Sequence, residues 1–174
     1  MIRLIIAYSI VIKSCYNSYM KYIFLIFLLL LNGCSIKNYE QTQTKIIIIK
    51  SPKIKFADIG YLRNSKNAIE LEMFVAGHGV NKISINHLIC MREGCMSKSG
   101  FNQEYLHHSY PDDILQNIFL GSKIYNGIES IKTLDGFEQN IRNNDVDIKY
   151  SVDSESIFFK DKKNKIIFKI KDSK

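Results

Sequence analysis

What the sequence lacks already restricts its function. Its 174 residues contain no Gly-x-Ser-x-Gly, no glycine-rich phosphate-binding loop and no His-Glu-x-x-His. The carboxylates fall at expected turns and on solvent-facing positions of expected strands. His107 and His108 are adjacent, so a strand or helix would point them in different directions, away from a shared metal site. We therefore predict a protein that is not an enzyme and has no catalytic residue, cofactor or metal.

A hydrophobic run long enough to cross a membrane is also missing from the N-terminal region. The apolar run Ile23–Leu31 has nine residues, whereas a spanning helix needs about 20. With Lys21 before it and Gly33 after it, the run fits a secretory signal, which has a basic start, a short apolar core and a small residue before the cut. The alternative is a buried core strand or helix that happens to end in cysteine.

The end of this run, Leu31-Asn32-Gly33-Cys34, resembles the lipobox of bacterial lipoproteins, Leu-x-Gly/Ala-Cys. The resemblance implies a signal peptide at residues 20–33, a diacylglyceryl group on the Cys34 thiol, and palmitate or a similar acyl chain on the new amino group. Ser35 stands where aspartate would retain the protein in the inner membrane. The resemblance therefore implies a lipid anchor in the outer membrane, on its periplasmic face.

Residues 1–19 are then left without a role. Arginine is scarce in the chain, which is rich in lysine, isoleucine, asparagine and tyrosine, and this usage is typical of an AT-rich genome. In such genomes in-frame start codons often lie upstream of the true one. We predict that residues 1–19 are a mis-called start extension and that Met20 is the initiator. The four arginines are Arg3, Arg63, Arg92 and Arg142.

Cleavage before Cys34 removes 33 of the 174 residues and leaves 141, enough for one domain with a real core. The net charge falls from +7 to about +4, because Arg3, Lys13 and Lys21 are removed without any acid. The remaining lysines alternate with apolar residues, so we predict no nucleic-acid partner. A weakly basic surface suits anionic lipid headgroups, and solubility explains it equally well. We expect a monomer.

Hydrophobic periodicity predicts a mainly β domain. Residues 35–44 are polar without a period, and residues 34–44 are predicted to be a lipidated tether, with a single domain at residues 45–174. Period-two alternation predicts strands at 53–59, 69–75, 83–89, 146–152 and 166–170. Two short helices are expected between residues 98 and 120, the second led by Pro111 and ended by Gly121. Short turns between the strands favour an antiparallel sheet.

Two cysteines remain beside Cys34 in the mature chain. Cys90 and Cys95 flank four residues that read as the tip of a hairpin, so a cross-hairpin disulfide is geometrically reasonable in an oxidising compartment. Two unpaired thiols are the alternative. A zinc site with His107 is disfavoured, because C-x₄-C differs from the usual C-x₂-C knuckle.

From Ile69 to Lys171 the order of parts resembles LolB, the outer-membrane lipoprotein that accepts lipoproteins from a periplasmic carrier. The similar segments are LEMFVAGHGVNKISI, YPDDILQNIFLG and the stretch from GFEQNI to DKKNKIIFKIK. LolA and mycobacterial LppX-type carriers share this fold. The resemblance implies an α+β fold, a curved antiparallel half-barrel lidded by two or three short helices, with a cavity for acyl chains. The cavity-facing residues would be Ile69, Leu71, Met73, Val75, Ile83, Ile85, Ile114, Leu115, Ile118 and Phe119.

One loop departs from the family. LolB carries an exposed leucine on a protruding loop between two early strands, and the matching loop here is Ala76-Gly77-His78-Gly79, without a large apolar tip. Insertion of transferred lipoproteins into the membrane is therefore not implied by this loop.

The expected function is non-covalent handling of acyl chains in lipoprotein or lipid localisation, with a LolA-like periplasmic carrier as a partner. Phe74, Phe158 and Phe159 lie on or beside strands whose other face is already apolar, which calls for covering helices or a lipid-like ligand. The alternative function is a structural or interaction lipoprotein of the cell envelope that carries no lipid cargo.

Overall fold

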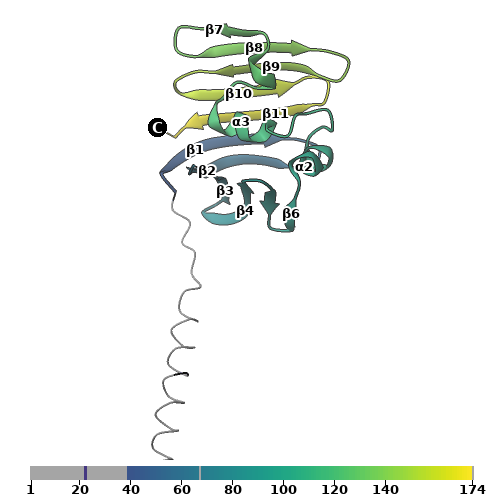
Figure 1. The fold of residues 1–174 in the computed structure, drawn as a ribbon. Coiled ribbons are helices and arrows are strands. Elements are labelled where there is room, and N and C mark those ends of the chain that lie inside the picture. Colours follow the sequence, from purple (N-terminus) through teal and green to yellow (C-terminus); the bar gives the residue numbers. More distant parts are fainter. Residues whose placement is uncertain (1–21, 23–38, 67, 174) are drawn as a thin grey trace, which may run out of the picture. The chain divides into compact units, whose positions relative to one another are not determined.

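The computed structural model describes residue 22, residues 39–66 and residues 68–173 (Figure 1). The predicted start extension, most of the signal peptide and Cys34 lie outside these residues. Tyr39–Lys174 forms one compact unit. Within the described part of the chain, no helix is both long and apolar enough to cross a membrane.

The domain is built on one antiparallel sheet of eleven strands, in the order β6-β5-β4-β3-β2-β1-β11-β10-β9-β8-β7. Two meanders of sequential strands are joined where the first strand, β1, pairs with the last, β11. The sheet is not closed, and the short strands β6 and β7 form its edges. The strands are β1 Gln41–Lys50, β2 Lys55–Asn64, β3 Ile69–Val75, β4 His78–Ile85, β5 Ile89–Met91, β6 Gly94–Met96, β7 Ser130–Lys132, β8 Phe137–Arg142, β9 Asp147–Val152, β10 Ser156–Asp161 and β11 Ile166–Asp172.

The connection from β6 to β7 runs from one edge of the sheet to the other and covers one face (Figure 1). It contains α2 (Lys98–Tyr105), α3 (Ile114–Leu120) and the 3₁₀ turn η1 (Tyr125–Gly127). Ser97 caps α2, since its hydroxyl accepts a hydrogen bond from the Gly100 amide at 3.0 Å. Gly121 ends α3 in the left-handed conformation with φ 63°. The mainly β, antiparallel architecture and the two short helices confirm the sequence prediction and are consistent with a curved half-barrel.

The sheet has a covered face and an open face, and a proximal and a distal end. The covered face lies under α2 and α3 and takes the buried side chains of β3, such as Leu71 and Met73, whereas Glu70 and Glu72 point to the open face. The proximal end is where β1 begins, and it includes the β7–β8 and β9–β10 turns. The distal end includes the β1–β2, β3–β4 and β10–β11 turns.

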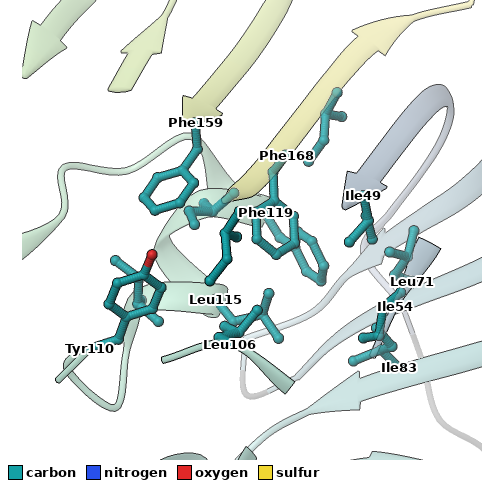
Figure 2. Close-up of a cluster of buried hydrophobic side chains, with 14 of the residues drawn as sticks. Ile49, Ile54, Leu71, Ile83, Leu106, Tyr110, Leu115, Phe119, Phe159 and Phe168 are labelled. Atoms are coloured by element: carbon teal, nitrogen blue, oxygen red, sulfur yellow. The ribbon is translucent and has the colours of Figure 1, made fainter. Parts of the chain in front are cut away.

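The core lies between the covered face and the helices (Figure 2). Phe119 of α3 meets Phe168 edge-on at a centroid distance of 6.2 Å, and Phe168 meets Phe159 in the same way at 5.9 Å. Tyr110, in the turn before α3, packs edge-on against Phe159 at 6.0 Å. Each buried aromatic ring contributes about 1.5–3 kcal/mol from burial alone, so these rings hold the helices on the sheet.

The first strand differs from the sequence prediction. β1 begins at Gln41 and so includes the last four residues of the predicted tether, because their backbone pairs with the end of β2, where Gln41 lies opposite Asn64. Ile47 and Ile49 point into the core, while Ile46 and Ile48 point to the open face and stay exposed. An unbroken apolar run carries no alternation, and this explains why periodicity did not assign it to a strand.

Candidate functional site

The predicted acyl-cavity residues lie in the packed core. Nine of the ten are at most 3% exposed, whereas Val75, at the end of β3, is 47% exposed. Figure 2 shows Leu71 and Ile83 from the sheet in the same cluster as Leu115 and Phe119 from α3. The prediction that Val75 faces the cavity is therefore wrong, because Val75 belongs to the β3–β4 hairpin at the distal end, past the edge of the core.

A groove at the distal end reaches this core from outside. It has a volume of about 550 Å³, and the candidate Met73 is part of its wall. Ile54 and Phe56 come from the β1–β2 turn and the start of β2, and Met91 comes from β5. Tyr105, the last residue of α2, borders the groove on the side of the helices. The groove thus lies between the last residue of α2 and the strands at this end.

The rim of the groove carries charge. Lys53 forms an ion pair with Glu104 of α2 at 2.7 Å and lies 5.5 Å from the centre of the Tyr105 ring. Lys55 and Glu93 also border the groove. The Lys53–Glu104 pair is exposed on both sides, and such pairs contribute about 0–1 kcal/mol. This polar contact therefore holds α2 only weakly to the β1–β2 turn.

A smaller hollow of about 190 Å³ opens at the proximal end. Phe119, another of the predicted cavity residues, lines it together with Leu62 and Leu120. A side chain at Gly121 would come within 3.3 Å of Val152 and Ile157, so the helix end sits close to the sheet there. The core is therefore approached from both ends, with the wider approach at the distal one.

The predicted protruding loop is a tight hairpin turn. Ala76 (φ 51°) and Gly77 (φ 80°) both have positive φ, which matches the type of two-residue turn that suits the twist of antiparallel strands. His78 and Gly79 are already part of β4, so the turn is shorter than the four-residue loop expected from the sequence. His78 is exposed. No large apolar side chain occupies the turn itself.

Cys90 and Cys95 pair across β5 and β6 and form a disulfide, with their Cα atoms 4.0 Å apart. The two cysteines close the hairpin whose tip carries Arg92 and Glu93. His107 is not part of this arrangement. Its ring lies 4.3 Å from that of His108, since both residues are in a turn rather than in a helix or strand as the sequence argument assumed. Burial and the neighbouring His108 lower the pKa of His107.

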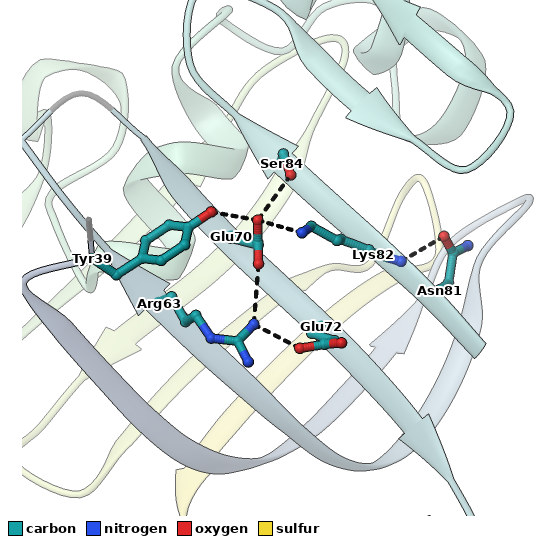
Figure 3. Close-up of polar contacts among 7 residues, drawn as sticks. All are labelled: Tyr39, Arg63, Glu70, Glu72, Asn81, Lys82 and Ser84. Carbon is teal, nitrogen blue, oxygen red and sulfur yellow. Dashed lines mark hydrogen bonds and ion pairs between the residues drawn. The ribbon is translucent and has the colours of Figure 1, made fainter. Parts of the chain in front are cut away.

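A polar cluster on the open face was missed by the sequence prediction (Figure 3). Glu70 is only 2% exposed, although its alternation with apolar neighbours assigned it to a solvent-facing position. Its carboxylate accepts a hydrogen bond from Tyr39 at 2.5 Å and pairs with Lys82 at 2.7 Å and Arg63 at 3.0 Å. Arg63 also pairs with Glu72 at 2.6 Å. The sequence signal was present, because Arg63, Glu70 and Glu72 fall on adjacent strands, but it needed the register.

These contacts decide the protonation of the cluster. Burial alone would raise the pKa of Glu70, but hydrogen bonds from Lys82 and Tyr39, with the charges of Lys82 and Arg63, lower it below its usual value. Burial and the hydrogen bond to Glu70 raise the pKa of Tyr39 to about 12. Tyr39 is the residue at which the domain begins, so the cluster fixes the start of the domain to the open face.

The cluster gives a prediction about pH. Because the folded-state pKa of Glu70 is lowered, its ionisation contributes stability above the unfolded value of about 4.3, and this contribution is lost as pH falls through the folded pKa. Glu70→Gln should therefore be destabilised at neutral pH and lose less stability than wild type on acidification below about pH 4. Urea unfolding across pH measures this, with the exposed Glu93→Gln as the control. Parallel curves for wild type and Glu70→Gln would contradict it.

A second buried carboxylate also lies outside the sequence prediction. Asp161 was assigned to a turn, yet it ends β10 and is fully buried. It accepts hydrogen bonds from the Tyr110 hydroxyl at 2.7 Å and from the Asn164 side chain at 2.7 Å. The backbone amides of Asp147 and Lys163 also donate to it, at 3.2 and 2.9 Å. Burial opposes ionisation, and these donors outweigh it and lower the pKa of Asp161.

The Asp161 contacts are structural in character. They connect the β10–β11 turn to β9 and to the turn before α3. The groups that donate to the Asp161 carboxylate are themselves side chains and backbone amides of the domain. Among the residues that the structure describes, no group of three or more His, Cys, Asp or Glu side chains could hold a metal ion. A ligand would then meet the distal groove, the proximal hollow or the open face.

Comparison with known proteins gave no family. No family model matches the chain, and neither the curated proteins nor the solved structures contain a significant match.

Proposed function

We propose that this protein is a lipoprotein anchored through Cys34 to the periplasmic face of the outer membrane, and that its domain binds acyl chains at the distal groove. The observation that carries the proposal is the groove of about 550 Å³ that leads to Met73 at the edge of the core. Its volume lies within the range of about 300–1,000 Å³ typical of ligand pockets. Ile54, Phe56 and Met91 give it the apolar wall that an acyl chain needs.

The arrangement of the helices supports a lid at this groove. α2 borders it through Tyr105, and the exposed Lys53–Glu104 pair is a weak polar contact between the helix and the sheet. An acyl chain that displaced α2 would reach Leu71, Met73 and Ile83, which were predicted to face it. Each CH₂ group buried there would contribute about 0.8 kcal/mol. A LolB-like half-barrel, with a LolA-like carrier as partner, is the finer form of this proposal, and the eleven-strand sheet with its helical cover supports it.

Acyl binding is tested with the domain from Tyr39 to Lys174, which holds every strand of the sheet and its core. Native mass spectrometry after bacterial expression should find a bound acyl chain, and a fluorescent fatty-acid probe should bind at the same site. Met91→Glu places a charge in the groove wall and should weaken probe binding about tenfold or more. Ile131→Glu, at an exposed site on β7, is the control. A domain that binds neither lipid nor probe would contradict the proposal.

The anchor is tested separately by metabolic labelling with radioactive palmitate. The wild-type chain should incorporate the label and fractionate with the outer membrane. Cys34→Ala should abolish labelling, because it removes the thiol and the residue that would become the new N-terminus. Labelling that is unchanged in Cys34→Ala would refute the anchor whatever the result for the groove.

A second candidate is an interaction lipoprotein without lipid cargo. The tight packing of nine of the ten predicted cavity residues, each at most 3% exposed, favours it. Exposed apolar residues at the β7 edge, namely Ile128, Ile131 and Leu134, could then contact an envelope partner. The probe titration separates the two candidates, since only the first requires an acyl chain to bind.

A further inference from the structure

The open face carries a row of lysines that the register brings together from distant parts of the sequence. Lys149 of β9 lies opposite Lys160 of β10, which lies opposite Ile167 of β11. Ile167 lies opposite Lys50 of β1, and Lys50 lies opposite Lys55 of β2. Paired residues point to the same face of a sheet. Four lysines therefore stand in one row across five adjacent strands.

The two neighbouring rows add two lysines and a set of apolar side chains. Lys169 and Lys171 of β11 continue the open face toward the proximal end. Ile46, Ile48 and Ile59 lie beside them and are 36–46% exposed. The first of these rows consists of Ser151, Phe158, Lys169, Ile48 and Ala57, and the second of Ser156, Lys171, Ile46 and Ile59, none of which is acidic. The first acidic residue beyond the first row is Glu138 of β8, opposite Ser151.

The six lysines are not neutralised by the fold. None of them forms an ion pair with any residue that the structure describes, whereas Lys45, Lys53 and Lys82 each pair with a carboxylate. Acidic neighbours on the open face stand at the borders of this group. Glu138 of β8 lies opposite Ser151, and Asp147 lies two residues before Lys149 on β9 and pairs with Arg142. At the proximal end Asp153 and Glu155 border an open hollow together with Lys171. The positive region therefore covers the middle and the distal part of the open face. We call Lys50, Lys55, Lys149, Lys160, Lys169 and Lys171 the lysine face.

A hollow of about 340 Å³ lies at the distal border of the lysine face. Lys50 and Lys160 line it together with Lys162 and Lys165 of the β10–β11 turn. Asp161 also contributes to its wall, but its carboxylate is buried and held by Tyr110, Asn164 and backbone amides. Four ammonium groups around one hollow repel one another, so an anionic group such as a phosphate would be stabilised there.

The start of the domain lies on the same face. Tyr39 reaches across to Glu70, an open-face residue, and fixes the backbone there. Five residues lead from Cys34 to Tyr39, so the two are separated by at most about 18 Å along a fully extended chain. An anchor at Cys34 would therefore hold a membrane within reach of the open face. A basic patch near a lipid anchor adds a second signal for membrane attachment.

We propose that the lysine face lies on an anionic lipid bilayer and sets the orientation of the domain on it. Ammonium groups pair with lipid phosphates there, and the exposed isoleucines between them contact the apolar part of the interface. Lying on this face turns the helices and the covered face away from the bilayer. Lys55 borders both the lysine face and the acyl-binding groove, and the other five lysines lie outside that groove. The position of the tether as support rests on the proposed Cys34 anchor.

The test uses the Tyr39–Lys174 domain, which lacks the anchor, in sedimentation with lipid vesicles. The domain should bind vesicles of phosphatidylglycerol mixed with phosphatidylcholine and should not bind vesicles of phosphatidylcholine alone. Binding should weaken as the salt concentration rises, since salt screens exposed charges. Absence of binding to the anionic vesicles, or equal binding to both kinds, would overturn the proposal. The acyl-probe titration is unaffected by either result.

Two triple variants remove the same charge from different places. Lys50→Gln, Lys149→Gln and Lys160→Gln together should weaken vesicle binding by about a hundredfold, from about fivefold for each lysine near an anionic surface. The control removes Lys66, Lys123 and Lys132 in the same way; these residues are exposed and lie outside the lysine face. Its loss should be about threefold or less. Equal losses in the two variants would show that net charge alone drives binding and would overturn the proposal.

A third variant separates a bilayer from a soluble polyanion such as a nucleic acid. Ile46→Thr with Ile59→Thr keeps β-branched residues in the strands but removes apolar contact from the lysine face. Vesicle binding should fall about fivefold or more, while thermal unfolding stays close to wild type. Duplex DNA bound as tightly as the anionic vesicles, or vesicle binding unchanged by the two substitutions, would overturn the bilayer as the partner.

Discussion

Asp161→Ala is expected to lower the free energy of unfolding by about 3 kcal/mol. The change removes an acceptor that serves two side chains and at least two backbone amides. The Tyr110 hydroxyl, on a residue that is 4% exposed, would be left buried without its partner. Leaving a buried donor unsatisfied costs about 1–3 kcal/mol, and the loss of the charged hydrogen bonds adds to it.

Urea unfolding of the Tyr39–Lys174 domain, followed by circular dichroism, measures this effect. Asp145→Ala is a matched control, because Asp145 is an exposed carboxylate in the neighbouring β8–β9 turn. It should change the free energy of unfolding by less than about 0.5 kcal/mol. Tyr110→Phe should cost about 1 kcal/mol, since it removes one donor and leaves Asp161 its others. Equal stabilities of Asp161→Ala and Asp145→Ala would show that the Asp161 contacts do not stabilise the fold.

Asp161 also illustrates what the sequence could not provide. Asp161-Lys-Lys-Asn-Lys165 is a typical turn, and that part of the prediction is right, because the chain reverses there between β10 and β11. The burial of its first residue depends on Tyr110, 51 positions earlier in the chain. Local composition carries no information about such a partner, so a buried carboxylate was assigned only to a turn.

Other parts of the fold could be predicted because their signals are local. Ile69, Leu71 and Met73 alternate with polar residues and form a strand with one buried face, as expected. Gly121 ends the second helix as expected, whereas the helix begins at Ile114, three residues after the predicted start at Pro111. The short turns between strands predicted the antiparallel sheet, and that prediction is confirmed. The pairing of β1 with β11 could not be predicted from the sequence, since it joins the two ends of the domain and depends on the whole topology.

The functional surfaces were harder to predict for the same reason. The lysine face takes one lysine each from β1, β2, β9 and β10 and two from β11. Lys55, Lys149 and Lys169 each stand between apolar residues along the chain. Along the sequence this alternation argued against a basic cluster. Across the sheet it produces one, because strands that are distant in the chain are adjacent in space. The register, and not the composition, therefore concentrates the charge.

Phe158 and Phe159 provide a paired test of these two faces. They are consecutive residues of β10, so their side chains point to opposite sides of the sheet. Phe159 is fully buried and packs edge-on against Phe168, Tyr150 and Tyr110. Phe158 points to the open face, where it lies opposite Lys169 and is partly exposed. The same substitution at the two positions should thus have different consequences.

Phe159→Ala is expected to destabilise the domain by about 3–5 kcal/mol, from lost burial and from the cavity left among three aromatic rings. Phe158→Ala should cost about 1 kcal/mol or less, since its ring is only partly removed from water. Denaturant unfolding measures both changes in the same domain. Phe158→Ala should in addition weaken binding to anionic vesicles without altering acyl-probe binding, because it lies on the lysine face. Similar losses of stability in both variants would show that the open face is as tightly packed as the covered one, and such a face would not be free to lie on a bilayer.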